Sequence, residues 1–256
     1  MLQRKQIERV HYEHSQLLGK LEVPHGFLER NGGVSPEPYA SLNLKYGIGD
    51  DKTHVDVNYE TIYRLFDLDQ DTHTKLMAEN KDQIVINPEP GLLKGYDAAI
   101  FTSGSVSITA ADCSSVLIVH REPDVCAIVH AGWYGVTRRI VERVMQELID
   151  RYQIDAKNCV AAIGPTIQAD NYEIQDDVAG EVKAHLPVDA HLVLKYRDKK
   201  TYLDIPKALV LQLQRMGVVE YEISETDTFE NDDFFSYRRD GNPTGRHGIF
   251  LKCPQA

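Results

Sequence analysis

One stretch of the chain, ADCSSVLIVHREPDVCAIVHAGWYG at 111–135, combines side chains that could do chemistry with runs typical of β-strands. Cys113 comes just before the first apolar run, and His130 ends the second. A histidine beside a cysteine can lower the thiol pKa and so produce a nucleophile. The same pair can instead bind zinc, which in catalytic sites takes three protein ligands and keeps one position open. The stretch therefore indicates either a Cys–His dyad or part of a metal site.

Strand pairing decides whether these two side chains meet. Residues 115–119 and 125–129 are continuous apolar runs of the kind that is covered on both faces of a sheet. The short connection at 121–124 predicts an antiparallel pair, which brings Cys113 and His130 out at the same edge of the sheet. Spacing alone favours a plainer interpretation, a core cysteine and a hydrogen-bonded histidine, because free cysteine is among the most buried residue types.

The other elements indicate one α/β or α+β domain with mixed sheets. Alternation at 105–110 and an apolar run at 159–163 predict two more strands. An amphipathic helix is expected over 136–149, before the second of these strands, and the order strand, helix, strand predicts a crossover unit. A second helix is expected near 55–67, where apolar residues recur with helical spacing, and a third at 205–216.

Composition argues against several classes of function. The chain has 256 residues and a net charge of −11, so general binding to nucleic acid or to an anionic membrane is not expected. No run reaches the roughly 20 apolar residues that a membrane span needs, and the N-terminus lacks the apolar core of a secretory signal. The four cysteines, at 113, 126, 159 and 253, show no paired short spacing, which argues against a zinc ribbon or a disulfide scaffold. We expect a cytoplasmic monomer or homodimer that acts on a small molecule.

An ordered set of motifs runs along most of the chain. Its members are PHGF at 24–27, PYASLNL at 38–44, TAADC at 109–113, HAGW at 130–133, AAIGP at 161–165 and FFSYRRDG at 234–241. Together they resemble the YfiH/YlmD family, also called the laccase-domain or multicopper polyphenol oxidase family. No single motif is decisive, but the ordered set is highly specific. The resemblance implies one α/β domain of stacked mixed sheets flanked by helices, spanning 1–256, with 1–20 as an N-terminal extension.

The same resemblance implies a chemistry. The family is associated with phosphorolysis of adenosine, inosine and methylthioadenosine, with adenosine deamination, and with a zinc centre of one Cys and two His. Cys113 and His130 match that centre directly. Copper, which the older family name implies, is less favoured, because copper oxidases use many histidine ligands and this chain has no clustered His motif.

Two departures from the family pattern stand out. The segment 76–85, where the second histidine ligand is expected, contains no histidine, and one of the residues at 79–82 takes its place. Of these, Glu79 is our candidate third ligand because a carboxylate can bind zinc through oxygen, whereas Asn80 or Lys81 would be a poor substitute. Tyr134 stands where the family has an arginine, which removes a bidentate anion donor.

Other polar residues are candidate substrate contacts. Arg30 precedes Gly32-Gly33 in a loop that could bind an anion, and Asn43 could contact a base or a ribose. Arg238, with Arg246, could bind phosphate or ribose. Asp112 could orient a metal ligand by a hydrogen bond without touching the metal itself. A plain turn, a strand-edge amide and a solvated salt-bridged turn are the structural alternatives for these positions.

Three hypotheses follow. The first is a zinc-dependent purine nucleoside enzyme that uses Cys113, His130 and Glu79 as ligands and takes a nucleoside and phosphate as substrates. The second is a metal-free cysteine hydrolase or deamidase in which Cys113 is the nucleophile and His130 the base. The third is a catalytically silent family member that acts as a binding module.

Overall fold

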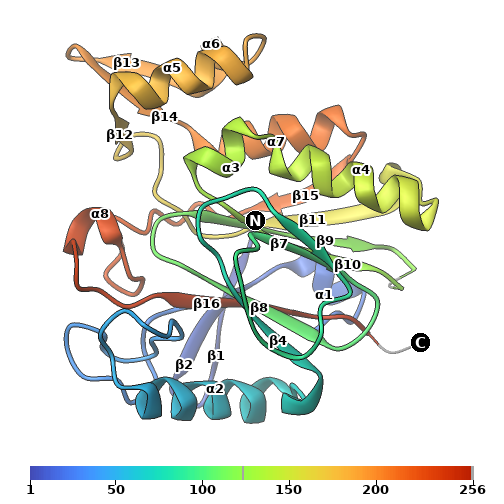
Figure 1. The fold of residues 1–256 in the computed structure, drawn as a ribbon, viewed down its shortest axis with the longest axis vertical. Coiled ribbons are helices and arrows are strands. Elements are labelled where there is room, and N and C mark those ends of the chain that lie inside the picture. The colour runs from blue at the N-terminus through green and yellow to red at the C-terminus, as the bar shows by residue number, and fades with distance from the viewer. Residues whose placement is uncertain (123, 255–256) are drawn as a thin grey trace.

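The computed structural model describes residues 1–122 and 124–254, and its centre is a pair of β-sheets packed face to face (Figure 1). The seven-stranded sheet has the order β1-β2-β3-β16-β8-β4-β6, and the six-stranded sheet has the order β15-β11-β9-β10-β7-β5. In the first sheet the strands are β1 (Gln3–Ile7), β2 (Val10–His14), β3 (His25–Leu28), β16 (His247–Lys252), β8 (Ser105–Ala110), β4 (His73–Met77) and β6 (Gly91–Lys94). In the second they are β15 (Glu220–Ile223), β11 (Cys159–Ile163), β9 (Ser114–His120), β10 (Cys126–Ala131), β7 (Ala98–Phe101) and β5 (Ile84–Ile86).

Helices cover the outer faces of both sheets and make a four-layer stack (Figure 1). Below the seven-stranded sheet lies α2 (Lys52–Phe66), and above the six-stranded sheet lie α3 (Trp133–Thr137), α4 (Ile140–Tyr152) and α7 (Ile205–Arg215). The smaller helical elements are α1 (Gln16–Lys20), α8 (Tyr237–Asp240) and two 3-10 turns, Gln70–Thr72 and Ala156–Asn158. The expected α/β architecture of stacked mixed sheets flanked by helices is confirmed.

Burial on both faces explains why the strands of the six-stranded sheet are continuously apolar. In β9, Val116 and Ile118 pack against the helices, whereas Leu117 and Val119 pack against the seven-stranded sheet. All four side chains are fully buried. Burying an aliphatic side chain of this size contributes about 1.5–3 kcal/mol. Strand β9 therefore stabilises the packing of the six-stranded sheet both against the helices and against the seven-stranded sheet.

Local signals set the helix ends. The carboxylate of Asp51 caps α2 by accepting from the backbone N–H of Thr53 at 2.8 Å, and Asp67 ends the helix in the left-handed conformation at φ 50°. Helices expected near 55–67 and at 205–216 are confirmed as α2 and α7. The single helix expected over 136–149 is wrong: the chain breaks at Arg138 and Arg139, and Arg139 has φ 53°, which separates α3 from α4.

The strand predictions near the chemistry are confirmed. β9 and β10 form an antiparallel pair, and β10 and β11 are parallel on either side of β9, so α3 and α4 make the expected crossover. Pro123 of the expected connection 121–124 lies outside the described residues. The segment 1–20, expected as an N-terminal extension, carries β1, β2 and α1, and β2 pairs with β3 in the seven-stranded sheet.

A small lobe stands above the helical layer (Figure 1). It holds a three-stranded sheet of β12 (Glu173–Ile174), β14 (Lys200–Leu203) and β13 (Leu194–Arg197), with α5 (Asp176–His185) and α6 (Ala190–Val193). No helix within the described part of the chain is both long enough and apolar enough to cross a bilayer.

Candidate active site

The β9–β10 hairpin brings Cys113 and His130 together. His130 pairs with Ser115 and Ala131 with Ser114, so Cys113 lies at the edge where β10 ends. Both residues line a cavity of about 400 Å³, as the hairpin prediction requires. The cavity lies at the ends of β8 and β10. Its lining residues are Lys45, Ala78, Asn80, Thr109, Ala110, Ala111, Cys113, His130, Tyr237 and Arg246.

Asp97 orients the imidazole of His130. Its Oδ1 lies 2.9 Å from His130 Nδ1, and its backbone carbonyl accepts from the His130 N–H at 2.7 Å. Cys113 lies beside the imidazole at the cavity wall and acts on it electrostatically. Burial lowers the pKa of His130, but the negative charge of Cys113 and the hydrogen bond with Asp97 outweigh it and raise that pKa to about 9. Asp97, His130 and Cys113 are thus arranged as an acid–base–nucleophile series.

The pKa of Asp97 is shifted in the opposite direction. Burial alone would raise it, but the hydrogen bond and charge of His130, together with two backbone amides, lower it. Those amides belong to Lys81, which donates to Oδ2 at 2.8 Å, and Asn80, which donates to Oδ1 at 3.1 Å. One buried carboxylate therefore fixes both the histidine and the loop that faces the cysteine.

Asn80 is the residue that this loop places against the thiol. The Cys113 Sγ lies 3.7 Å from Asn80 Oδ1. Gly132 leaves room for this contact, because a Cβ at position 132 would lie only 2.9 Å from the Cys113 sulfur and 3.1 Å from the Asn80 amide oxygen. Glu79 points elsewhere: its carboxylate pairs with Lys81 at 2.8 Å and does not line the cavity. Glu79 as a metal ligand stays a prediction, and its placement does not favour it.

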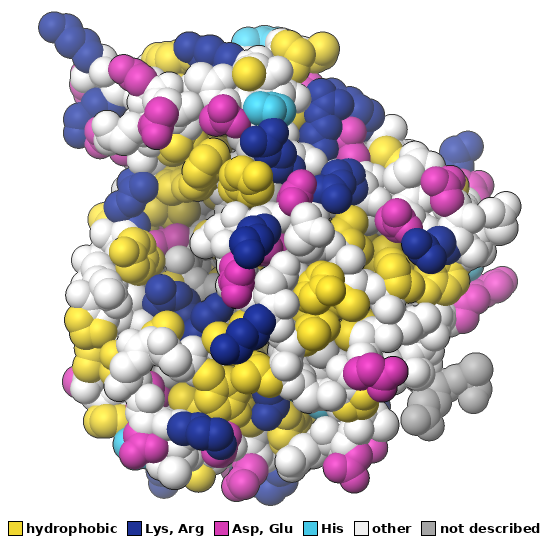
Figure 2. Space-filling view, viewed as in Figure 1, with side chains coloured by type: hydrophobic (Ala, Val, Ile, Leu, Met, Phe, Trp, Pro, Cys, Tyr) yellow, Lys and Arg dark blue, Asp and Glu magenta, His cyan; other side chains and the backbone are white. Residues whose placement is uncertain are grey.

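Two cationic side chains face the cysteine across the cavity. Lys45 Nζ donates to the carbonyl of Ala78 at 3.0 Å, and Arg246 Nη1 donates to the carbonyls of Thr244 and Gly245, each at 2.8 Å. Burial lowers the pKa of Lys45, and Arg246 lowers it further. On the face drawn in Figure 2, Lys and Arg side chains gather around a hollow near α8. The cavity of an acidic chain is therefore locally positive, which suits an anion.

Asn43 hydrogen-bonds to the backbone of both Lys45 and Arg246. Its Oδ1 accepts from the backbone N–H of Lys45 at 3.1 Å and of Arg246 at 3.0 Å. Its Nδ2 donates to Asp50 Oδ2 at 2.8 Å and to the carbonyl of Lys45 at 3.2 Å. Asn43 is fully buried and is not among the residues that line the cavity. Its amide is used within the protein, which favours a role in positioning the two cations, and Asn43 as a contact to a base or ribose stays a prediction.

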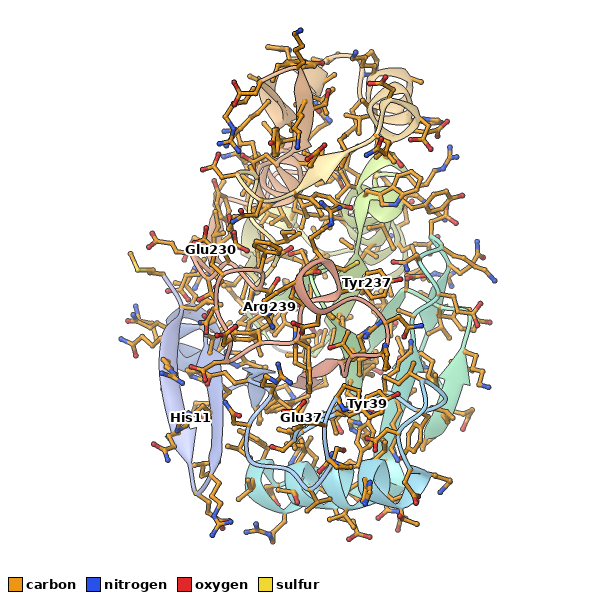
Figure 3. The ribbon with its side chains drawn as sticks, turned by 90° about the vertical axis from the view of Figure 1, so that its left-hand side faces the viewer. His11, Glu37, Tyr39, Glu230, Tyr237 and Arg239 are labelled. Carbon is orange, nitrogen blue, oxygen red and sulfur yellow. The ribbon has the colours of Figure 1, made fainter. Side chains whose placement is uncertain are left out.

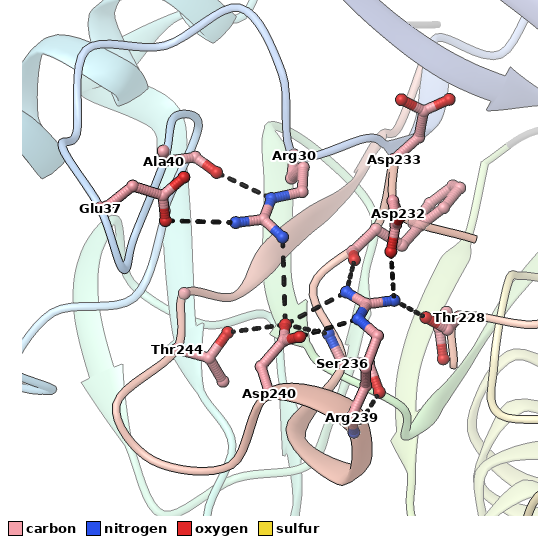
Figure 4. A network of polar contacts seen from close by, with 12 residues as sticks. Arg30, Glu37, Ala40, Thr228, Asp232, Asp233, Ser236, Arg239, Asp240 and Thr244 are labelled. Atoms are coloured by element: carbon pink, nitrogen blue, oxygen red, sulfur yellow. Dashed lines mark hydrogen bonds and ion pairs between the residues drawn. The ribbon is translucent and has the colours of Figure 1, made fainter. Parts of the chain in front are cut away.

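Arg30 belongs to a polar network beside the cavity (Figure 4). Its Nε donates to the carbonyl of Ala40 at 2.8 Å, its Nη1 lies 3.9 Å from Asp240, and its guanidinium stacks 4.5 Å above the ring of Phe235. Asp240 in turn accepts from Arg239 Nε at 2.7 Å. These contacts link the Arg30 loop to residues on both sides of α8, and Arg30 as an anion-binding residue stays a prediction.

Asp112 connects the cysteine to α8. It has φ 85°, and its carboxylate accepts from Thr228 Oγ1 at 2.8 Å and from the backbone N–H of Arg238 at 2.6 Å. Because Tyr237 precedes Arg238 and lines the cavity, Asp112 fixes the wall opposite the sheets. Figure 3 shows Tyr237 on α8, above the loop that carries Tyr39. Arg238 itself does not line the cavity, because its guanidinium donates to the carbonyl of Glu173 at 2.9 Å.

The donor chemistry does not match a catalytic metal centre. Within 1–122 and 124–254, no three His, Cys, Asp or Glu side chains converge as a metal site would require. Cys113 and His130 are suitable zinc donors, but the third neighbour, Asn80, offers a neutral amide oxygen. A site with several copper ions fits still less well, because it needs a cluster of histidines.

Three cavity residues and one orienting residue escaped the sequence reasoning or were given no specific role. Asp97, in the Asp-Ala pair at 97–98, and Tyr237, in the motif at 234–241, belong to the ordered motifs of the resemblance but were given no role. Lys45 was not singled out, and Asn80 was only a poor alternative to Glu79. A weak signal existed for Asp97, a lone carboxylate directly before the apolar run 98–101. Tyr134 is not in the cavity lining, since its ring lies under Arg138 at 5.0 Å.

The chain is similar to several known proteins along most of its length. The family model described as multi-copper polyphenol oxidoreductase laccase matches residues 24–253. A purine nucleoside phosphorylase of Deinococcus radiodurans is 33% identical over 236 residues, covering 92% of this chain and 91% of that protein. Purine nucleoside phosphorylase YfiH of Escherichia coli is 34% identical over 230 residues, covering 87% and 90%. The crystal structure of YlmD from Geobacillus stearothermophilus shares the fold, with a TM-score of 0.92 over 99% of both chains at 24% identity.

Proposed function

This chain belongs to the multi-copper polyphenol oxidoreductase laccase family, and we propose that it is a purine nucleoside phosphorylase whose reaction takes place in the Cys113 cavity. Relatives at 33% and 34% identity carry that activity in their names. The observation that supports the proposal most directly is the pairing, in one cavity, of an acid–base group with two cations.

Phosphorolysis needs an anion site next to the sugar. Lys45 and Arg246 would hold phosphate, because two cations in a partly buried cavity bind a divalent anion far more strongly than isolated surface charges do. The phosphate oxygen attacks the anomeric carbon while the bond from that carbon to the purine nitrogen breaks. The products are a free purine and a sugar 1-phosphate.

The leaving purine must receive a proton. His130 is the group that can pass one, since its ring is oriented by the Asp97 carboxylate and lines the cavity beside Cys113. No step in this scheme requires a metal. Zinc, which the family resemblance led us to expect, would find Cys113 and His130 as donors but Asn80 in the third position. Adenosine deamination, the other activity expected from the resemblance, would bind the nucleoside in the same cavity and would not need phosphate.

A second candidate function is a metal-free cysteine hydrolase or deamidase. The series Asp97, His130 and Cys113 supports it, because a carboxylate that orients a histidine beside a thiol is the arrangement of cysteine nucleophiles. In that case Cys113 would form a covalent intermediate with an acyl or amidine carbon. The cations Lys45 and Arg246 would then bind an anionic group of the substrate.

The test is product analysis by chromatography. Adenosine, inosine and methylthioadenosine are each incubated with the purified protein, with and without phosphate. Phosphate-dependent release of the free base supports phosphorolysis, and Cys113→Ala and Lys45→Met should each lower it by about 10²-fold or more. Conversion of adenosine to inosine without phosphate would indicate deamination instead.

Two results would count against the proposal. Base release that is independent of phosphate would indicate hydrolysis. No turnover of any nucleoside, with the protein folded, would leave the cysteine hydrolase or the silent binding module as the remaining interpretations.

A further inference from the structure

We infer that the Cys113–His130 centre works without a resident zinc or copper ion, and that Asn80 is the residue responsible. The inference deepens the proposed function, and rests on it only in taking this centre as the reactive one. It concerns the donor set of the site and can be measured without any substrate.

The carboxylates near the centre are not free to bind a metal. Both oxygens of Asp97 are used, Oδ1 by His130 and Asn80 and Oδ2 by Lys81. Glu79 pairs with Lys81 outside the cavity lining. Of the polar residues around the cavity, only Cys113 and His130 are strong donors for a borderline or soft metal.

The charges around the centre also oppose a cation. Lys45 and Arg246 line the same cavity, and among the described residues no carboxylate lines it. A divalent cation bound to Cys113 would face both of them at short range in a partly desolvated space, where like charges repel strongly. A thiolate and an imidazole alone do not offset that repulsion, because a stable zinc site draws on three or four protein donors.

Position 80 is nonetheless held where a third ligand would have to be. Its backbone N–H is fixed by Asp97 at 3.1 Å, and its side-chain oxygen lies 3.7 Å from the Cys113 sulfur. Asp97 also orients His130 through Nδ1, which is how carboxylates orient histidine ligands in metal sites. The scaffold is therefore one side chain short of a three-donor site, and Asn80→His should supply it.

Metal analysis of the wild-type protein is the primary test. The full chain is purified without metal-affinity resin or chelator, and its zinc and copper are measured by mass spectrometry. We expect less than about one-tenth of a metal ion per chain, against about one for a protein with a structural or catalytic zinc. Half an equivalent or more of either metal, lost in Cys113→Ser, would overturn the inference.

Thiol labelling gives an independent readout. Cys113 is partly exposed, whereas Cys126, Cys159 and Cys253 are buried, so alkylation of the folded protein reports on Cys113. A metal-bound thiolate is protected, and a chelator then accelerates its alkylation. We expect the same labelling rate with and without a chelator, and an acceleration would overturn the inference.

Asn80→His should create a metal site. The variant should take up about one zinc per chain and lose it again in the double variant Asn80→His/Cys113→Ser. Asn80→Gln, which keeps an amide, is the matched control and should bind none. A folded Asn80→His that binds no zinc would refute the role of Asn80, and if that variant does not fold, the two wild-type measurements decide. A metal-free protein that turns over no nucleoside would refute the proposed function and leave this inference standing.

Discussion

Replacing Asp97 with asparagine tests whether one buried carboxylate organises the centre. Asp97 accepts through both oxygens, from His130 Nδ1 at 2.9 Å, the Asn80 amide at 3.1 Å and the Lys81 amide at 2.8 Å. An asparagine has the same shape but only one accepting oxygen. Whichever way its amide turns, its NH₂ group faces at least one of these donors, so a hydrogen bond is lost and a donor–donor contact replaces it.

The magnitude follows from these contacts. Losing the charge-assisted bond to His130 costs about 2 kcal/mol, and leaving one partly buried amide without its acceptor costs about 1 kcal/mol more. The total of about 3 kcal/mol corresponds to a melting temperature lower by roughly 6–12 °C in a chain of this size. Activity should fall by about 10²-fold or more, because the imidazole loses the group that orients it.

The pH dependence gives the prediction a signature. The pKa of Asp97 is lowered in the folded protein, so its contribution to stability is complete above the unfolded value and is lost as the pH falls through the folded value. The stability difference between wild type and Asp97→Asn should therefore be largest near neutral pH and shrink below about pH 4. Thermal unfolding followed by circular dichroism at several pH values measures it.

A matched control separates this effect from a general loss of negative charge. Asp232→Asn removes a carboxylate that is 93% exposed and 3.6 Å from Arg239, and should change stability by less than about 0.5 kcal/mol. If Asp97→Asn is as stable and as active as the wild type, or if the difference between them does not depend on pH, Asp97 does not organise the centre.

Three further predictions concern residues around the cavity and in the core. Asn43→Ala removes the acceptor shared by the backbone amides of both cations, so stability should drop by about 2 kcal/mol, and KM for phosphate should rise more than kcat falls; an unchanged KM would contradict the positioning role. Gly132→Ala puts a Cβ 2.9 Å from the Cys113 sulfur, so it should cost about 1–3 kcal/mol and slow alkylation of the thiol, and faster alkylation would contradict the contact. His73 is buried between two serine hydroxyls, and burial lowers its pKa to about 3. Its neutral form stabilises the fold above the unfolded pKa and this stabilisation is lost as the pH falls, so the destabilisation of His73→Gln relative to wild type should shrink by about 3 kcal/mol between pH 7 and pH 4; calorimetry that shows a constant difference would refute the assignment of a neutral His73.

Much of the fold could be predicted because its signals are local. Apolar runs without alternation identified β9, β10 and β11, which are buried on both faces. A short polar connection predicted the hairpin that pairs β9 with β10. The division of the 136–149 helix into α3 and α4 was missed, because the left-handed Arg139 is not a residue type that signals a helix end.

Two members of the candidate site could also be predicted, for the same reason. Cys113 and His130 flank one hairpin, so their meeting depends only on the pairing of neighbouring strands. The substrate candidates Arg30, Asn43 and Arg238 were chosen by residue type, and each turned out to use its polar atoms on the protein itself. The residue type shows what a side chain can bind, but it does not show whether the folded protein already supplies a partner for that side chain.

From the sequence one could predict the pairing of the strands around the cysteine, the approach of Cys113 to His130 and the lack of a histidine at 76–85. The surroundings of Cys113 and His130 depend on tertiary packing. Lys45 and Arg246 come from distant parts of the chain and line one cavity with Cys113 and His130, while Asp97 lies behind His130 and hydrogen-bonds to its imidazole. Such contacts carry no spacing signal, because they depend on how sheets pack and not on how a strand or turn forms. Packing therefore made the site positive, placed Asn80 and not Glu79 against the thiol, and gave His130 its carboxylate.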